Sequence, residues 1–150
     1  MRAEFQVLVI PFIRNENEGT KYLVFKRTDN SNWQFIAGGG EDSEIPLEAA
    51  KRETREEANI IASEFYFLKT ISMIPITEFR GHKSKKGLYV IPEYCFAVEM
   101  KNAVINISME HTDYKLATYT EATSLLRYDG NKTALWELNE RIKANDLDRV

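Results

Sequence analysis

The chain has 150 residues, of which 43% are hydrophobic and 29% are charged, with a formal net charge of −3. This balance predicts one domain over residues 1–150 with a sizeable core, and it argues against a general nucleic-acid or membrane binder. The apolar run near the start is too short for a membrane span and lacks a signal-peptide cleavage site. The single cysteine, Cys95, excludes an intrachain disulfide, so we expect a cytoplasmic protein.

The first third of the chain predicts apolar strands that precede a helix. Residues 5–13 form a near-continuous apolar run rich in valine and isoleucine, which is typical of a buried strand. A polar turn at residues 15–19 separates this run from residues 21–27, which we expect to pair with it as a hairpin. A short apolar segment at residues 33–36 is followed by three glycines at residues 38–40, which predict a loop.

A helix is expected next, from the region of residues 43–46 to Ala58. Pro46 suits the first helical turn, because the N–H group that proline lacks would have had no partner there. Asn59 stands in the terminating position, where asparagine is the second choice after glycine for a left-handed residue. This one helix therefore contains most of the acidic residues in its stretch of sequence.

The second half of the chain predicts further strands. Residues 64–75 indicate one or two strands, and residues 79–87 form a basic loop flanked by glycine. Residues 88–100 alternate in the manner of a strand. Residues 101–111 show little pattern and predict a loop, and residues 114–117 predict a last short strand.

Two helices are expected to close the chain. Thr118 and Glu121 match a capping box, which should open a short helix through residues 125–126, and the pair at residues 129–130 should end it. Asn131 should then cap a final helix. One face of that helix carries three apolar residues: Leu135, Leu138 and Ile142. The order of elements indicates a mixed α/β (α+β) domain without the regular alternation of a parallel doubly wound sheet.

The acidic residues of the first predicted helix fall on a stripe beside its buried face. At about 100° per residue, five residues form the buried face: Leu47, Ala50, Thr54, Ala58 and Ile61. Glu53, Glu56 and Glu57 form the neighbouring stripe, with Cβ atoms within about 5–6 Å of one another, and Ala49 leaves room beside them. Arg52 lies next to this stripe and is able to neutralise and orient a carboxylate.

Carboxylates crowded in this way favour a bound cation, because like charges destabilise a bare helix. Mg²⁺ binds carboxylate oxygens together with substrate phosphates. The glycines ahead of the helix let the backbone approach a phosphate or a metal closely, and a carbonyl there is a candidate ligand. The stretch therefore predicts a metal–phosphate site, in which a cation bridges phosphate oxygens and acidifies a bound water.

The spacing of the whole stretch matches a known motif. Its fixed positions are Gly38, then Glu44 after five residues, Arg52–Glu53 after seven more, and Glu56–Glu57 after two more. This pattern resembles the Nudix box of the MutT-like Nudix hydrolases, and it decides against the alternative of a merely solvated acidic helix face. Thr54 and Asn59 depart from the family pattern, which expects an aliphatic residue and a glycine there. The resemblance implies an α/β/α sandwich with a mixed sheet, the box helix and C-terminal helices.

The resemblance also implies which residues bind metal. Glu56 and Glu57 should be the principal ligands of Mg²⁺, with Mn²⁺ as an alternative, and the Gly38 carbonyl should join them. Glu53 should help to bind the metal or handle the attacking water.

Three further residues take supporting roles in the resemblance. Arg52 should orient Glu53, and Glu44 should support the site as an additional carboxylate. Family members often carry one more catalytic glutamate beyond the box, and Glu110 is the candidate here, against the alternative of an exposed loop acid.

Candidate substrate-binding residues lie on both sides of the box. Arg27 and Trp33 precede it, although Trp33 is also a candidate core residue. Arg80 and Lys83 belong to the basic loop, which either is solvated or draws a phosphate chain toward the acidic site. The two histidines, His82 and His111, are expected at the surface rather than on the metal, because the predicted site is rich in hard oxygen ligands.

The substrate itself is less determined. The Trp33–Gln34 pair, the Glu110–His111 pair and the tail helix resemble the bacterial dihydroneopterin triphosphate pyrophosphatases. We therefore expect a small-molecule nucleoside or pterin triphosphate to be cleaved to a monophosphate and pyrophosphate by a monomer or homodimer. The alternatives are an ADP-ribose or diadenosine polyphosphate pyrophosphatase, and a non-catalytic nucleotide sensor.

Overall fold

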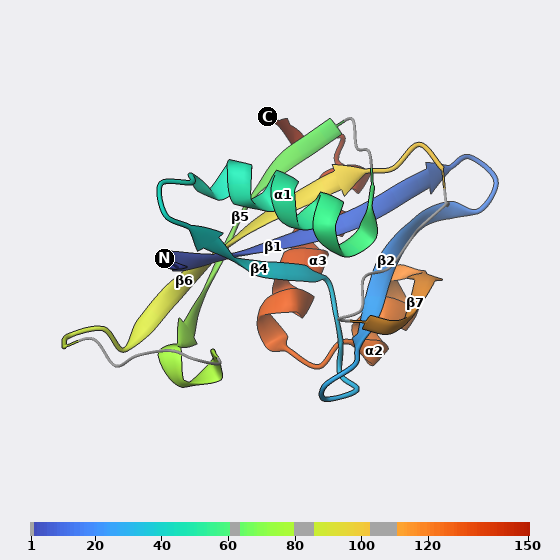
Figure 1. Ribbon diagram of the computed structural model, residues 1–150. Coiled ribbons are helices and arrows are strands. Elements are labelled where there is room, and N and C mark those ends of the chain that lie inside the picture. The colour runs from blue at the N-terminus through green and yellow to red at the C-terminus, as the bar shows by residue number, and fades with distance from the viewer. Residues whose placement is uncertain (1, 61–63, 80–85, 103–110) are drawn as a thin grey trace.

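The computed structural model describes residues 2–60, 64–79, 86–102 and 111–150. A mixed sheet forms the middle layer, with helix α1 on one face and helices α2 and α3 on the other (Figure 1). This arrangement confirms the predicted α/β/α sandwich. Among the described residues, no helix is both long enough and apolar enough to cross a membrane.

The sheet has the strand order β3-β2-β1-β6-β5-β8, and β4 and β7 pair with β1 and β2 respectively. The strands are β1 (Arg2–Asn15), β2 (Gly19–Arg27), β3 (Trp33–Gln34), β4 (Ile36–Glu41), β5 (Glu64–Pro75), β6 (Val90–Glu99), β7 (His111–Ala117) and β8 (Asp148–Arg149). The helices are α1 (Pro46–Ala58), α2 (Tyr119–Leu125) and α3 (Asp129–Lys143), with a short 3-10 helix at Ile76–Glu78. β1 and β6 run parallel, whereas the other pairs are antiparallel.

β1 lies at the centre of the fold because both of its faces are apolar. Leu8 and Ile10 face the core under α2 and α3, whereas Val7 and Val9 face the core under α1, and all four are fully buried. A strand that is buried on both faces requires a continuous apolar run rather than an alternating one. Each such side chain contributes about 1.5–3 kcal/mol of burial free energy, so residues 5–13 hold both layers together.

β1 changes its neighbour partway along its length. Its first part pairs with β4 as far as Val9, and its last part pairs with β2 from Phe12 onward. Pro11 lies between the two ladders. The Phe12 carbonyl accepts a hydrogen bond from Met100 on the β6 side, so the Pro11 nitrogen points the other way, toward the gap. The N–H group that proline lacks therefore removes no bond from either ladder.

Helix α1 has the predicted bounds and a broader buried face than predicted. It begins at Pro46, and Asn59 ends it in the left-handed region with φ 49°. Thr54 is buried as predicted, but Ala49 and Glu57 are buried as well. The helix thus turns part of its acidic stripe inward against the sheet. Ile61 lies outside the described residues.

The three glycines lie within strand β4 rather than in the predicted loop. A Cβ atom on Gly38 would overlap the Glu53 carboxylate, and one on Gly40 would overlap the Phe5 ring. Glycine is needed here because other side chains occupy the space beside an extended backbone.

The C-terminal elements begin earlier than predicted. β7 starts at His111, and the capping box of α2 is confirmed, with the Glu121 N–H group 3.2 Å from Thr118 Oγ1. α3 starts at Asp129, so Asn131 lies inside the helix and does not cap it. Its side chain instead accepts a hydrogen bond from the Phe35 N–H group at 3.1 Å. The buried Phe35 N–H group thus binds the Asn131 side-chain oxygen, which would otherwise have capped the helix.

A carboxylate holds α3 against the sheet. Glu137 accepts hydrogen bonds from the N–H groups of Lys69 at 2.7 Å and Thr70 at 2.8 Å. These donors lie where the ladder between β5 and β6 is interrupted, between Phe67 and Ile71. The helix therefore satisfies backbone groups that the sheet leaves unpaired at this point.

The bond between Asn131 and Phe35 gives a prediction about stability. Asn131→Ala should lower the free energy of unfolding by about 1–3 kcal/mol, because it leaves a buried N–H donor unsatisfied. Urea denaturation measures this loss. Thr133→Ala, on the exposed face of the same helix, is the matched control and should change stability by less than about 0.5 kcal/mol. Equal losses in both variants would contradict the assignment.

Candidate active site

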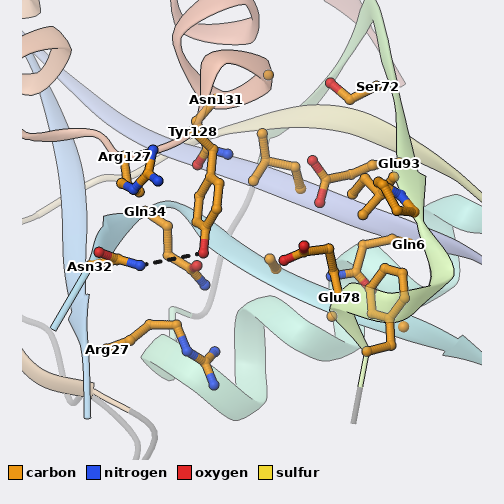
Figure 2. Close-up of a pocket in the computed structure, with 18 of the residues that line it drawn as sticks. Gln6, Arg27, Asn32, Gln34, Ser72, Glu78, Glu93, Arg127, Tyr128 and Asn131 are labelled. Atoms are coloured by element: carbon orange, nitrogen blue, oxygen red, sulfur yellow. Dashed lines mark hydrogen bonds between the residues drawn. The ribbon is translucent and has the colours of Figure 1, made fainter. Parts of the chain in front are cut away.

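A cavity of about 980 Å³ opens beside strand β4. Gly38, Glu53 and Glu57 line one part of it, and Tyr128 and Asn131, from the junction of α2 and α3, line another. Figure 2 shows the side chains that point into this space from the strands and from that junction. The cavity thus joins the acidic helix to residues that are far from it in the sequence.

Arg52 connects helix α1 to the residues ahead of it. Its guanidinium donates two hydrogen bonds to Glu44, each 2.9 Å long, and one to the Gly39 carbonyl at 2.9 Å. It also donates to Glu53 Oε1 at 2.7 Å and to Glu56 Oε2 at 3.2 Å. The paired bonds to one carboxylate use the planar fork of arginine, which lysine cannot reproduce. The contact between Arg52 and Glu53 that the resemblance implies is therefore present.

This network fixes charge as well as position. The hydrogen bond from Arg52 lowers the pKa of Glu44 below its ordinary value. Conversely, the Glu44 and Glu53 carboxylates raise the pKa of the Arg52 guanidinium, which stays charged. Glu44 also accepts a hydrogen bond from the Glu41 N–H group at 2.8 Å. The carboxylate of Glu44 therefore joins the turn before α1 to the arginine within α1.

The three acids of the helix stripe lie in different surroundings. The side chain of Glu57 is only 4% exposed and that of Glu53 is 12% exposed, whereas that of Glu56 is 59% exposed. The helical wheel predicts neighbours, but it does not predict how the helix is rotated against the sheet. Glu57 faces inward, Glu53 lies beside Gly38, and Glu56 faces outward.

His111 is buried beside Glu57, so the prediction of a surface histidine was wrong. Its Nε2 atom lies 3.9 Å from Glu57 Oε2, and its ring centroid lies 4.9 Å from that of Phe25. The cause is the pairing of β7 with β2, which sets His111 opposite Arg27. A single histidine in a polar stretch carries no sequence signal for this long-range pairing.

The donor set fits a hard divalent cation. Glu53, Glu57 and the Gly38 backbone line the same cavity and offer oxygen atoms, which Mg²⁺ and Mn²⁺ prefer. Among the described residues, no three acidic, histidine or cysteine side chains converge as a ready-made cluster. Arg52 instead holds Glu53 and Glu56 through hydrogen bonds. A cation would therefore share these carboxylates with the arginine.

The predicted substrate-binding residues have different locations. Arg27 lines the cavity and forms an ion pair with Asp29 at 3.0 Å. Trp33 packs against the core under α2 and α3 and is not part of the cavity lining, whereas Gln34 is. The core alternative for Trp33 was therefore the better one, because its indole covers apolar side chains. Arg80, Lys83 and Glu110 lie outside the described residues, and their roles stay predictions.

Sequence reasoning missed the residues that the α2–α3 junction contributes. The Arg127 N–H group donates to the Trp33 carbonyl at 3.2 Å, which anchors this junction to β3. Tyr128 then lines the cavity, and its hydroxyl accepts a hydrogen bond from Asn32 at 3.5 Å (Figure 2). Two hydrogen bonds between segments that are distant in the sequence produce this part of the site, so no local motif could predict it.

Sequence reasoning also missed Glu93, which is 5% exposed and lines the same cavity. A sequence signal for it existed. Glu93 alternates with Cys95 and Ala97, which face the core under α2 and α3, and an acid on the apolar face of a strand is unusual.

The contact between Arg52 and Glu44 gives a prediction with a defined pH dependence. Glu44→Gln should lower the free energy of unfolding at pH 7 by about 1.5–3 kcal/mol, the range for hydrogen bonds to charged groups. Because the folded-state pKa of Glu44 is lowered from 4.5, its stabilisation is fully present above pH 4.5 and is lost as the pH falls through the folded value. The difference in the free energy of unfolding between wild type and Glu44→Gln should therefore become smaller in acid.

Urea denaturation at a series of pH values from 7 to 3 tests this. Glu41→Gln is the matched control, because Glu41 lies 3.8 Å from Arg52 and its side chain is 66% exposed, so its effect should stay small. If the difference in unfolding free energy between wild type and Glu44→Gln stays constant with pH, the stabilisation does not depend on the ionisation of Glu44.

Known proteins share both the sequence pattern and the fold. Residues 5–136 match the model of the NUDIX domain. The asymmetrical bis(5'-nucleosyl)-tetraphosphatase of Mus musculus is 28% identical over 123 residues, covering 81% of this chain and 80% of the mouse protein. The solved structure of a protein from Listeria monocytogenes, named as a NUDIX hydrolase, is 44% identical and has a TM-score of 0.88, covering 99% of this chain and 100% of that chain.

A second solved structure shares the fold at lower identity. The dihydroneopterin triphosphate pyrophosphohydrolase of E. coli has a TM-score of 0.74 and 22% identity, covering 92% of this chain and 97% of that chain. The family match spans most of the chain and includes the complete acidic motif of α1. The chain therefore belongs to the NUDIX family, whose members are pyrophosphohydrolases that act on acid anhydrides and generally use divalent metal ions.

Proposed function

We propose that this protein hydrolyses a phosphoanhydride bond of a nucleoside or pterin triphosphate in the presence of Mg²⁺, giving a monophosphate and pyrophosphate. One observation carries the proposal: a single cavity is lined both by the acids Glu53 and Glu57 and by the ring and amide groups of Tyr128 and Asn131. A triphosphate has two matching parts. Its phosphates bind a divalent cation that the carboxylates hold. Its planar ring binds to stacking surfaces and polar groups.

The charged residues of α1 have distinct tasks in this proposal. Glu56, Glu57 and the Gly38 carbonyl would hold the divalent cation, with Mn²⁺ as an alternative to Mg²⁺. When bound, the cation supplies positive charge to the phosphates and lowers the pKa of a bound water. Arg52 keeps the Glu53 carboxylate oriented through its 2.7 Å hydrogen bond, so that Glu53 can accept a proton from the attacking water. Glu44 supports this geometry by holding Arg52 from the other side.

The phosphate chain requires cationic partners beyond the metal. Arg27 lines the cavity, and Arg80 and Lys83 of the basic loop are further candidates by sequence. Arginine binds phosphate through two parallel hydrogen bonds, which fixes orientation as well as charge. We therefore assign Arg27 to the binding of the phosphate chain.

A dinucleoside polyphosphate is the second candidate substrate, because the mouse relative is a bis(5'-nucleosyl)-tetraphosphatase. The products distinguish the two substrate classes, because a nucleoside triphosphate cleaved as proposed yields pyrophosphate, whereas diadenosine tetraphosphate yields two nucleotides.

A substrate screen tests the proposed function. Nucleoside triphosphates, dihydroneopterin triphosphate, diadenosine tetraphosphate and ADP-ribose are incubated with the protein in Mg²⁺ and in excess chelator, and all products are quantified by chromatography. We expect Mg²⁺-dependent release of pyrophosphate from a triphosphate, and no turnover in chelator. Nucleotide binding without turnover across the whole panel would support the non-catalytic sensor instead.

The ligand assignment predicts the effect of two isosteric substitutions. Glu56→Gln and Glu57→Gln should each leave the fold intact and lower Mg²⁺-dependent kcat by about 100-fold or more, because each removes a negatively charged oxygen ligand that we propose for the cation. Steady-state kinetics and circular dichroism measure the two effects.

Glu48→Gln is the matched control for these variants. Glu48 lies exposed on the same helix, and its carboxylate accepts a hydrogen bond from the Ile45 N–H group at 2.9 Å. Glutamine preserves that cap, so turnover should be unchanged. If turnover survives in Glu56→Gln or Glu57→Gln, the assignment of that residue as a metal ligand is wrong.

A further inference from the structure

Glu93 is a buried carboxyl group that faces the cavity without a partner in the described protein. It lies on β6, is 5% exposed and lines the cavity (Figure 2). Among the described residues, no hydrogen bond or ion pair engages its side chain. Burial raises its pKa to about 7. A carboxyl group in such a place costs stability unless a ligand supplies the missing hydrogen bonds.

The strand register fixes where Glu93 lies relative to the acidic helix. Gly39, Gln6, Glu93 and Ser72 pair in one row across β4, β1, β6 and β5. Two strand spacings therefore separate Glu93 from Gly39, a distance of about 10 Å. Gly39 is adjacent to Gly38, which contacts Glu53. A ring joined to its phosphates by a sugar or a short carbon chain can span this separation.

The neighbours of Glu93 suit a planar ring with polar edges. Ser72 pairs with Glu93 in register, and its hydroxyl lies against Gly130 at the start of α3. Asn131 follows Gly130, and its Oδ1 atom is engaged by Phe35, so its amide nitrogen is the donor it can offer. Phe79 and Tyr128 also line the cavity and offer aromatic faces. The site thus combines two acceptor oxygens, nearby donors and stacking surfaces.

This combination distinguishes between ring types. An ionised carboxylate only accepts hydrogen bonds, so its two oxygens require two adjacent N–H donors. The edge of guanine or of a 2-amino-4-oxo pterin presents such a pair, a ring N–H group beside an amino group. The edge of adenine presents a donor beside an acceptor, which a carboxylate does not match.

We propose that the Glu93 carboxylate binds the amide–amine edge of a guanine or 2-amino-4-oxopterin ring and thereby selects the triphosphate that is cleaved. This inference rests on the proposed function and defines its substrate class. Hydrogen bonds from the ring N–H and amino groups to the two carboxylate oxygens replace the missing protein partners. Ser72 and Asn131 are positioned to donate to the ring carbonyl beside that edge.

The test combines a change in the protein, Glu93→Gln, with a change in the substrate, the loss of the 2-amino group of the ring. Wild type should favour GTP over ITP, which lacks that amino group, by about 10- to 100-fold in kcat/KM, the discrimination of one bidentate contact. Glu93→Gln should reduce this preference to near unity. The change should fall mainly on KM, because the contact binds substrate and transition state alike. ATP should be a poor substrate for wild type.

Two controls separate this role from a structural one. Glu140→Gln, a partly exposed acid on α3, should leave the GTP preference unchanged. Glu93→Gln should melt at or above the wild-type temperature, because it removes an unpaired buried carboxyl group. A loss of kcat on every substrate, or a GTP preference that survives in Glu93→Gln, would overturn the inference.

Binding measurements distinguish failure of this inference from failure of the proposed function. Isothermal titration with α,β-methylene analogues of GTP and ITP reports the preference without turnover. If wild type prefers the GTP analogue and Glu93→Gln does not, the inference holds even where no triphosphate is hydrolysed, and the proposed function alone fails. If triphosphates are hydrolysed but neither assay shows a preference dependent on Glu93, or if neither analogue binds, the inference fails.

Discussion

The hydrogen bonds of Arg52 are the constraint on which the rest of the site depends. One guanidinium joins the acidic helix to the turn before it through Glu44 and to strand β4 through the Gly39 carbonyl. The same group holds Glu53 at the wall of the cavity. Three carboxylates on one helix would otherwise repel one another and rotate freely. The fixed positive charge of Arg52 holds two of them, Glu53 and Glu56, in place before any cation or substrate binds.

The sheet complements this constraint because it has no side chain at Gly38. Gly38 leaves the space beside β4 that the Glu53 carboxylate occupies, so the acids of α1 reach a cavity on the far side of that strand. A side chain at this position would separate the helix from the cavity. The motif therefore combines two requirements: the carboxylate of Glu53 on the helix, and a glycine at position 38 of the strand. The carboxylate reaches the cavity only when both are met.

The sequence predicted those parts of the protein that depend on local patterns. The limits of α1 followed from Pro46 and Asn59, and the central place of β1 followed from its unbroken apolar run. The acids of the box and Arg52 followed from their spacing. In contrast, the burial of Glu57 depends on the rotation of α1, and that of His111 on the pairing of β7 with β2. Asn131 was misplaced because its side chain bonds across 96 residues of sequence rather than to its own helix. The part of the site that we propose to bind the ring comes from such long-range pairings, whereas the proposed metal ligands lie on one segment, residues 38–57.

The position of β1 beside the cavity has a consequence for how such proteins diversify. β1 is buried on both faces, and its residues Gln6 and Leu8 line the cavity. This part of the cavity wall is thus continuous with the core, so a substitution there also disturbs core packing. The α2–α3 junction lies outside the sheet and contributes lining side chains such as Tyr128. Under our proposal, substrate preference therefore depends on individual lining side chains, both within the sheet, such as Glu93, and outside it, such as Tyr128. A single substitution at such a position would change the ligand, while the acids on α1 stay in place.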